Sequence, residues 1–355
     1  MLSDMKRSKK QRSWVDIQER DIDIFDAIWS LRYATVNQIA ALFPSAQPSV
    51  MINPRGEFRG GAKAIAHRLA KLTAHDYLQR IGWSLRRPTE PAVYTLGSKA
   101  GYLLAQKRDH KLEEIQTHVK YIRKCLSSNT AKKHIYLEHR LGINNFRVGL
   151  ALALRGSQKA DWAYDSEGKH YWMEPTLRVK KGEKPNAIII KVDVEDLPPK
   201  VRKYLKLGGQ EITTIRRVPD AMFLLDIQGH KLGVLYEKDR GTEKHDVMAA
   251  KLACYYHWFK QGLHKKTFGT NHLRVIVETS SIKRLKGLIE STALPVKMVG
   301  GRPQGCGIFW FTCQENIGID NPERILEPIW TVGHAKHLNE KHGLLEAPLR
   351  GEKRP

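Results

Sequence analysis

The spacing of apolar residues in the first third of the chain changes from helical to strand-like and back, and this order constrains the fold more than any other feature. Ile22, Phe25 and Trp29 recur at the spacing of one helix face, which predicts a helix from about residue 16 to 33. The elements predicted after it are helices over 36–42 and 62–75, strands over 77–83 and 92–96, and a helix over 97–107. Three helices, a hairpin and a helix form the order of a winged helix-turn-helix domain, which we predict over residues 16–110.

The predicted third helix has one apolar and one basic face. At about 100° per residue, Ile65, Leu69 and Leu72 lie within one arc, and three basic side chains lie within the opposite arc. We therefore predict that this helix contacts duplex DNA and that the hairpin tip contacts the flanking backbone. The predicted DNA-binding residues are the capping-box pair Thr35 and Gln38, then Lys63, His67, Arg68 and Lys71 on the helix, and Arg86 and Arg87 at the hairpin tip.

The charge balance indicates a polyanionic partner. The chain has 60 Lys and Arg against 37 Asp and Glu, a formal net charge of +23, and residues 1–111 alone carry +9. A globular chain this basic most often binds nucleic acid, because each cation that neutralises a phosphate releases condensed counterions. An anionic membrane surface is the weaker alternative, since no basic helix with a strong apolar face stands out. A winged helix that contacts another protein remains a second alternative.

Composition excludes other classes of protein. No apolar run reaches eighteen residues, which excludes a membrane span, and the polar N-terminus does not resemble a secretory signal. The four cysteines have no paired C-x-x-C spacing, which argues against a disulfide scaffold or a four-cysteine zinc site. We expect a cytoplasmic, nucleoid-associated protein.

The segments that flank the predicted domains are basic or polar. Residues 1–15 are predicted to be a disordered basic arm, and residues 331–355 a flexible tail. Residues 111–130 carry apolar side chains at helical spacing. That helix is either a linker or a dimerisation helix, and the second reading makes the protein a homodimer that binds paired half-sites.

The second half of the chain, residues 131–330, is predicted to be an α/β domain with a mixed sheet, which makes the whole chain α+β. A long helix over 134–155 begins it, and the pattern from 157 to 217 is hard to assign beyond strand pieces at 171–172 and 187–194. The elements after that are strands over 219–225 and 232–239, a helix over 243–260, a strand over 272–278, a helix over 282–291 and a strand over 307–311.

Three carboxylates are predicted to meet at one edge of this sheet. Asp220 begins a strand, and Glu237 and Asp239 end its hairpin partner on one face, because side chains two apart on a strand point the same way. Such a cluster suits Mg²⁺, with Asp220 and Glu237 as ligands, and the metal could serve phosphodiester cleavage. The alternative is that the acids pair with a basic side chain such as Arg240 and hold the sheet edge in place.

Several short motifs resemble the replication-relaxation family of plasmids and other mobile elements, whose members have a winged helix in front. The resemblance spans most of residues 20–280, is patchy over 157–217 and is absent after about 290. The motifs are Ala34-Thr35-Val36-Asn37-Gln38-Ile39-Ala40, Arg68-Leu69, Pro91-Ala92-Val93-Tyr94-Thr95-Leu96-Gly97, Leu137-Glu138-His139 with Asn144 and Phe146, Val218-Pro219-Asp220-Ala221, and the run from Tyr236 to Glu243.

The resemblance implies a second domain similar to the PD-(D/E)xK nuclease fold. In that pattern Asp220 matches the first acid, Glu237 the second, and Glu138 the helix glutamate. The lysine position holds Asp239, which cannot orient an attacking water as a lysine would. Lys251, on the following helix, is the candidate for a shifted lysine.

Two functions from different classes follow. The first is a sequence-reading DNA-binding protein of a mobile element, which acts in replication initiation or control, or in transcription regulation, together with other replication or mobile-element proteins. The second is a Mg²⁺-dependent DNA endonuclease or nickase directed by the winged helix. The aspartate in place of lysine favours the first function, without enzyme activity and with no firm cofactor.

Overall fold

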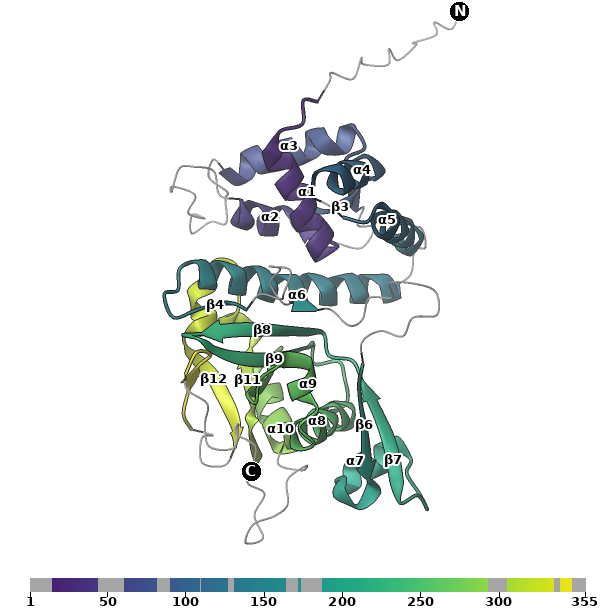
Figure 1. The fold of residues 1–355 in the computed structure, drawn as a ribbon, viewed down its shortest axis with the longest axis vertical. Coiled ribbons are helices and arrows are strands. Elements are labelled where there is room, and N and C mark those ends of the chain that lie inside the picture. The colour runs from purple at the N-terminus through teal and green to yellow at the C-terminus, as the bar shows by residue number, and fades with distance from the viewer. Residues whose placement is uncertain are drawn as a thin grey trace, which may run out of the picture. The chain divides into compact units, whose positions relative to one another are not determined.

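The computed structural model describes residues 15–43, 61–81, 90–108, 110–126, 131–163, 172–173, 187–292, 305–334 and 339–346. Arg86, Arg87 and nearly all of the predicted basic arm lie outside the described residues. The chain divides into two compact units, Met1–Asn144 and Asn145–Pro355, and the boundary falls inside a single helix, α6 (Ala131–Arg155). Helices and sheets occur in both units, so the predicted α+β class is confirmed (Figure 1).

The first unit is a helical layer with a small sheet. Its elements are α1 (Glu19–Leu31), β1 (Ala34–Thr35), α2 (Val36–Leu42), α3 (Gly61–Ala74), β2 (Leu78–Ile81), β3 (Val93–Leu96), α4 (Ser98–Lys107) and α5 (Leu112–Leu126). The three strands form an antiparallel sheet in the order β1-β3-β2. The apolar faces predicted for α1 and α3 are buried in the core of this unit, as Ile22 and Phe25 show on one helix and Leu69 and Leu72 on the other.

Buried amides attach the first half of α6 to this unit. The Gln38 side chain, which also caps α2, donates a hydrogen bond to the carbonyl of Leu141 at 3.1 Å. Asn144 Nδ2 donates to the carbonyls of Leu31 (3.1 Å) and Tyr33 (2.6 Å), the residues at which α1 ends. Since a buried carbonyl without a donor costs about 1–3 kcal/mol, these bonds stabilise the packing of α6 on α1 and α2.

The second unit is built on an eight-stranded mixed sheet. Its strand order is β13-β12-β11-β10-β9-β8-β4, and β5 pairs beside β4 on β8. These strands are β4 (Ala160–Trp162), β5 (Trp172–Met173), β8 (Ala221–Ile227), β9 (His230–Asp239), β10 (Leu273–Thr279), β11 (Gly305–Cys313), β12 (Pro328–His334) and β13 (His342–Gly343). Strands β8 and β9 form an antiparallel hairpin, whereas β9, β10 and β11 run parallel.

Helices cover both faces of this sheet. Phe146 of α6 stacks on Tyr236 of β9, with ring centroids 4.2 Å apart. On the other face, α8 (His245–Lys260) and α10 (Ile282–Thr292) pack their apolar side chains against Leu235, Val275 and Val277 (Figure 1). Burial on both faces explains why β10 is buried at every position and why its sequence does not alternate.

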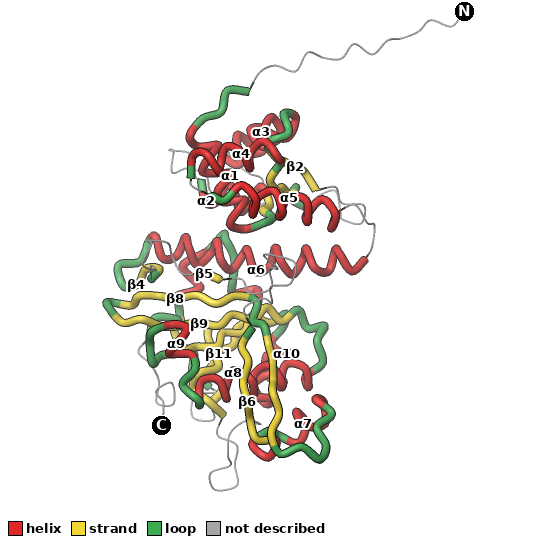
Figure 2. Tube along the Cα trace, turned by 45° about the vertical axis from the view of Figure 1, so that its right-hand side comes forward, coloured by secondary structure: helices red, strands yellow, loops and turns green. Residues whose placement is uncertain are grey.

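A short arm is inserted before β8. Strands β6 (Ile188–Asp193) and β7 (Ile212–Arg217) form a separate antiparallel sheet, and the connection between them contains helix α7 (Pro199–Leu205). Figure 2 shows α7 at the end of this hairpin. Alternate residues of β6 are buried, and Ile188, Ile190 and Val192 join the core cluster that includes α8.

The C-terminal segment is also paired into the sheet where it is described. Strand β12 pairs with β11, and β13 pairs with β12. The buried Arg274 guanidinium lies over the Trp310 ring and donates hydrogen bonds to the carbonyls of Leu344 and Glu346. None of the described helices combines the length and the apolar character that a membrane crossing needs.

Candidate functional site

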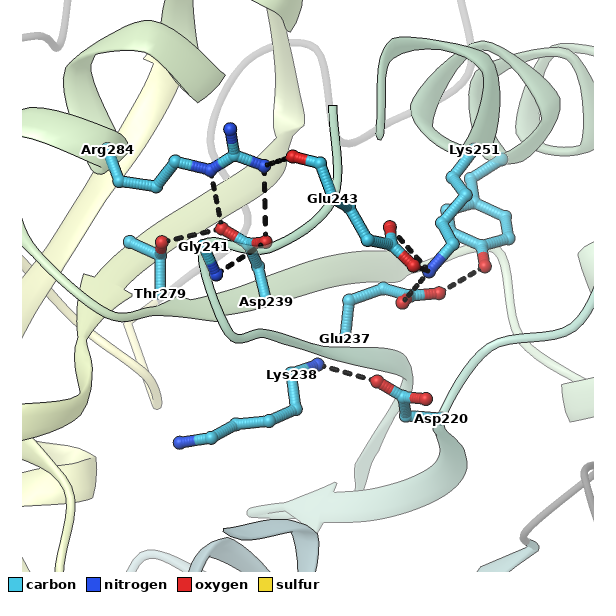
Figure 3. A network of polar contacts seen from close by, with 10 residues as sticks. Asp220, Glu237, Lys238, Asp239, Gly241, Glu243, Lys251, Thr279 and Arg284 are labelled. Carbon is cyan, nitrogen blue, oxygen red and sulfur yellow. Dashed lines mark hydrogen bonds and ion pairs between the residues drawn. The ribbon is translucent and has the colours of Figure 1, made fainter. Parts of the chain in front are cut away.

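The carboxylates predicted from the sequence lie at the C-terminal end of β9, on the face that α8 covers (Figure 3). Glu237 and Asp239 are both buried and share this face, as their spacing predicts. Lys238, between them, points to the opposite face and pairs with Glu278, which also accepts a hydrogen bond from the Tyr236 hydroxyl. The strand therefore separates two polar clusters.

Glu237 is the centre of the first cluster. One carboxylate oxygen accepts a hydrogen bond from Lys251 Nζ at 3.1 Å, and the other accepts one from the Tyr255 hydroxyl. Lys251 and Tyr255 are four residues apart and so lie on the same face of α8. Lys251 Nζ also lies 3.2 Å from a carboxylate oxygen of Glu243.

Asp220 completes this cluster from the start of the neighbouring strand. It directly precedes β8, and its carboxylate accepts a hydrogen bond from the backbone N–H of Lys238 at 2.8 Å. Its backbone N–H in turn donates to the carbonyl of Tyr236 at 3.1 Å. The hairpin register thus brings Asp220 beside Glu237, as the sequence predicts.

The protonation of the cluster depends on its burial. Loss of solvation raises the pKa of Glu237 to about 7; the Lys251 ammonium opposes this shift, and the nearby Asp220 adds to it. Burial also opposes the charged form of Lys251, but Glu237, Asp220 and Glu243 hold the pKa of its ammonium above the ordinary value. Near neutral pH the Glu237 carboxylate is therefore poised between its two states, while Lys251 stays charged.

Asp239 belongs to a second, adjacent group of contacts. Arg284 of α10 donates to both of its oxygens, at 2.9 and 3.2 Å, and the Thr279 hydroxyl and the Gly241 N–H also donate to it. Burial by itself would raise the pKa of Asp239, but the hydrogen bonds from Arg284 and Thr279 hold it below its usual value. Asp239 therefore ties the end of β9 to β10 and α10.

The donor set fits a bound metal poorly. Among the described residues no group of three or more His, Cys, Asp and Glu side chains could hold a metal ion. Asp220 and Glu237, the predicted ligand pair, have the Lys251 ammonium beside them, and both Glu237 oxygens are engaged by Lys251 and Tyr255. A divalent cation on Glu237 would have to displace one of these two partners.

The remaining predicted catalytic residue lies apart from this cluster. Glu138 is half-buried on the part of α6 that belongs to the first unit, whereas Asp220, Glu237, Asp239 and Lys251 belong to the second. The sequence suggested Arg240 as a basic partner of the acids; in the structure Lys251 pairs with Glu237 and Arg284 pairs with Asp239.

The predicted DNA-binding residues of the first unit fall into two groups. Lys63 and His67 are exposed on α3, and Lys71 is partly exposed. The side chains of Thr35 and Gln38 are buried and bond to each other's backbone N–H at the start of α2, at 2.9 and 3.1 Å, so their polar groups are engaged within the protein.

Arg68 is tied into the protein as well. It forms a two-pronged ion pair with the Asp21 carboxylate, whose side chain is 2% exposed, and donates to the Asp16 carbonyl at 2.6 Å. The contact raises the pKa of Arg68, mainly through the hydrogen bond to Asp21. Arg68 therefore fixes α3 against α1.

Four residues of the cluster escaped the sequence analysis: Glu243, Tyr255, Thr279 and Arg284. Tyr255 could have been found, because it follows Lys251 at helical spacing. Thr279 and Arg284 carried no such signal, since only the parallel pairing of β10 with β9 brings Thr279 opposite Asp239.

The model of the replication-relaxation family matches residues 25–273, which is more than half of the chain, and the protein belongs to this family. Membership associates it with the replication of mobile elements. No curated protein and no solved structure matches the chain.

Arg68→Ala is expected to destabilise the first unit. The substitution leaves the buried Asp21 carboxylate without its cation, which costs about 3 kcal/mol of unfolding free energy. Lys63→Ala, an exposed change on the same helix, should alter stability by less than about 0.5 kcal/mol. Urea denaturation followed by circular dichroism measures both; equal stability of the two variants would refute the structural role of Arg68.

Glu237→Gln is expected to remove a pH dependence of stability. Because burial raises the pKa of Glu237 from 4.5 to about 7, its contribution is complete below pH 4.5 and is lost as the pH rises to 7. The stability of wild type relative to the Gln variant should therefore fall by up to about 3 kcal/mol across this range. Urea titrations at a series of pH values test this, with the exposed Glu290→Gln as control. A difference that is constant, or that grows with pH, contradicts the prediction.

Proposed function

We propose that the protein binds duplex DNA during the replication of a plasmid or other mobile element, and that the first unit is a winged helix-turn-helix domain. The observation that carries this proposal is α3, which exposes Lys63 and His67 on one side and buries Leu69 and Leu72 on the other. The order α1-β1-α2-α3-β2-β3-α4 with an antiparallel three-stranded sheet supports the winged-helix assignment.

In this proposal the residues of α3 have different roles. Lys63, His67 and Lys71 contact DNA, with phosphate contacts supplying affinity and base contacts supplying sequence preference. Arg68 positions the helix through Asp21, and the capping box of Thr35 and Gln38 fixes α2 beneath it. Arg86 and Arg87 contact the flanking backbone, and a dimer formed through α5 would bind paired half-sites in the nucleoid.

We further propose that the second unit derives from the PD-(D/E)xK nuclease fold. The order of a helix, three antiparallel strands, a helix and a parallel strand is met by α6, β4, β8, β9, α8 and β10. Asp220 and Glu237 occupy the acidic positions and Asp239 the lysine position. Since Asp239 is held by Arg284 and Thr279, it supports the sheet edge and takes no part in cleavage.

Removal of the α3 cations tests the DNA-binding function. Lys63→Ala with Lys71→Ala should lower the slope of log affinity against log salt by about 1.8, because each phosphate that is no longer neutralised lowers it by about 0.9. Lys99→Ala with Lys107→Ala, two exposed lysines of α4, is the matched control and should leave the slope unchanged. Fluorescence anisotropy with labelled duplex measures both, and equal slopes for the two variants would disprove phosphate binding by α3.

One observation favours a DNA nickase as the second candidate function. Lys251 Nζ lies 3.1 Å from Glu237 and senses the charge of Asp220, so α8 supplies an ammonium group that the β9 motif lacks. A lysine ammonium at this place can orient a water molecule and stabilise developing negative charge on a phosphate. Two acids and a lysine are therefore present, in a different arrangement along the chain.

The nickase is tested on supercoiled plasmid with Mg²⁺ and with EDTA. If the second candidate holds, wild type nicks only with Mg²⁺, and Lys251→Met and Glu237→Gln lose about 100-fold or more in rate. Lys260→Met, an exposed change on the same helix, keeps the wild-type rate. Plasmid that stays supercoiled with wild-type protein under all conditions excludes the nickase and leaves the DNA-binding function standing.

A further inference from the structure

We infer that α7, at the end of the β6–β7 arm, is a second contact surface for the phosphate backbone of duplex DNA. The surface consists of Lys200, Lys203 and Lys206, which are all exposed, with Tyr204 beside them at 40% exposure. It belongs to the second unit, so it is separate from the α3 face. The inference rests on the proposed function in taking DNA as the ligand.

The charge of this surface is not neutralised within the described part of the protein. Residues 197–210 contain four Lys and Arg and no Asp or Glu. No ion pair is found for Lys200, Arg202, Lys203 or Lys206 among the described residues, whereas Lys260 on the neighbouring α8 pairs with Asp196 at 3.5 Å. A group of unpaired cations raises the local concentration of a polyanion and releases its counterions on binding.

The stability of the helix does not explain where these cations stand. Arg202, Lys203 and the C-cap Lys206 lie near the C-terminus of α7, where the helix dipole favours positive charge. Lys200 lies in the first turn, where the same dipole disfavours a cation. A ligand that binds the whole surface accounts for Lys200 as well as for the other three.

The arm holds α7 in a fixed place. Pro198 and Pro199 begin the helix, where a fixed φ suits the first turn, and Gly209, at φ +70°, follows its end. Val201 is fully buried and Leu205 packs against the same core cluster as α8 (Figure 2). The lysines therefore stand on an anchored helix, so that little conformational entropy is lost when they bind.

Duplex DNA fits this surface better than an anionic membrane does. A membrane-bound helix inserts an apolar face between the lipids, and the apolar face of α7 is already buried in the protein. The exposed side of α7 offers lysines that need only reach outward to phosphates. Contacts of this kind position a protein on DNA without reading its sequence.

The test compares two matched triple variants of the full chain on a linear duplex several helical turns long. Lys200→Gln with Lys203→Gln and Lys206→Gln should lower the slope of log affinity against log salt by about 2.7, about 0.9 for each phosphate. The same positions changed to Arg should restore the wild-type slope. Lys266→Gln with Lys283→Gln and Lys286→Gln, exposed lysines of the same unit, should have no effect.

A lysine footprint gives a direct second measurement. Acetylation of the wild-type chain, read by mass spectrometry, should show that duplex DNA protects Lys200, Lys203 and Lys206 but not the three control lysines. Thermal unfolding of both Gln variants should match wild type, since all the altered side chains are exposed.

The outcomes separate this inference from the proposed function. If the α7 variant matches the control in slope and DNA leaves the α7 lysines reactive, the inference is wrong, and a weakened Lys63/Lys71 variant keeps the proposed function standing. If the α7 variant alone loses salt dependence, the inference holds and the α3 assignment fails. Protection by anionic vesicles and not by DNA overturns the inference, and absence of any duplex binding by wild type overturns both.

Discussion

The buried carboxylate of Glu237 on the central strand β9 is the constraint on which the second unit depends. A carboxylate moved out of water costs several kcal/mol unless a cation and hydrogen bonds replace its solvation. Lys251 and Tyr255 supply both from one face of α8, so this helix must lie where its ammonium and hydroxyl reach the strand. Apolar packing of α8 on the sheet permits several registers, and the buried charge selects one of them.

Asp239 extends the same principle along the strand. Its contacts with Thr279 and Arg284 connect β9 to the next parallel strand and to the helix after it. A lysine in this position would bring a second cation toward Arg284 and leave Thr279 without its acceptor. The departure from the nuclease pattern is therefore part of a consistent local structure, in which Lys251 and Arg284 provide the positive charge from the helices.

A similar division of labour holds in the first unit. Arg68 and Asp21 fix α3 on α1, and Gln38 and Asn144 attach α6 by hydrogen bonds to backbone carbonyls. These buried polar groups leave Lys63 and His67 as side chains on a rigid helix with no structural task. Functions that involve DNA are best served by such residues, because phosphate contacts need a scaffold that is already ordered.

The sequence by itself determined the elements whose signals are local. The helix at 36–42 was predicted with its bounds, because its capping box and Pro44 act within a few residues, and the carboxylates of β9 share a face because side chains alternate on a strand. The family was also evident from the sequence. Contacts across distant segments were not: the arm at 188–217 and strand β12 have no local signal strong enough to identify them.

Only the tertiary structure decided which polar residues are available to a ligand. Arg68, Lys63 and Lys71 look alike in a helical projection, but Asp21, 47 residues away, engages Arg68 and leaves Lys63 exposed. Lys251 is one of many lysines in the sequence, and it becomes part of the Glu237 cluster because α8 folds back over β9. The physical reason is that the cost of burying a charge depends on its neighbours in space, and these neighbours exist only after the strands and helices have packed.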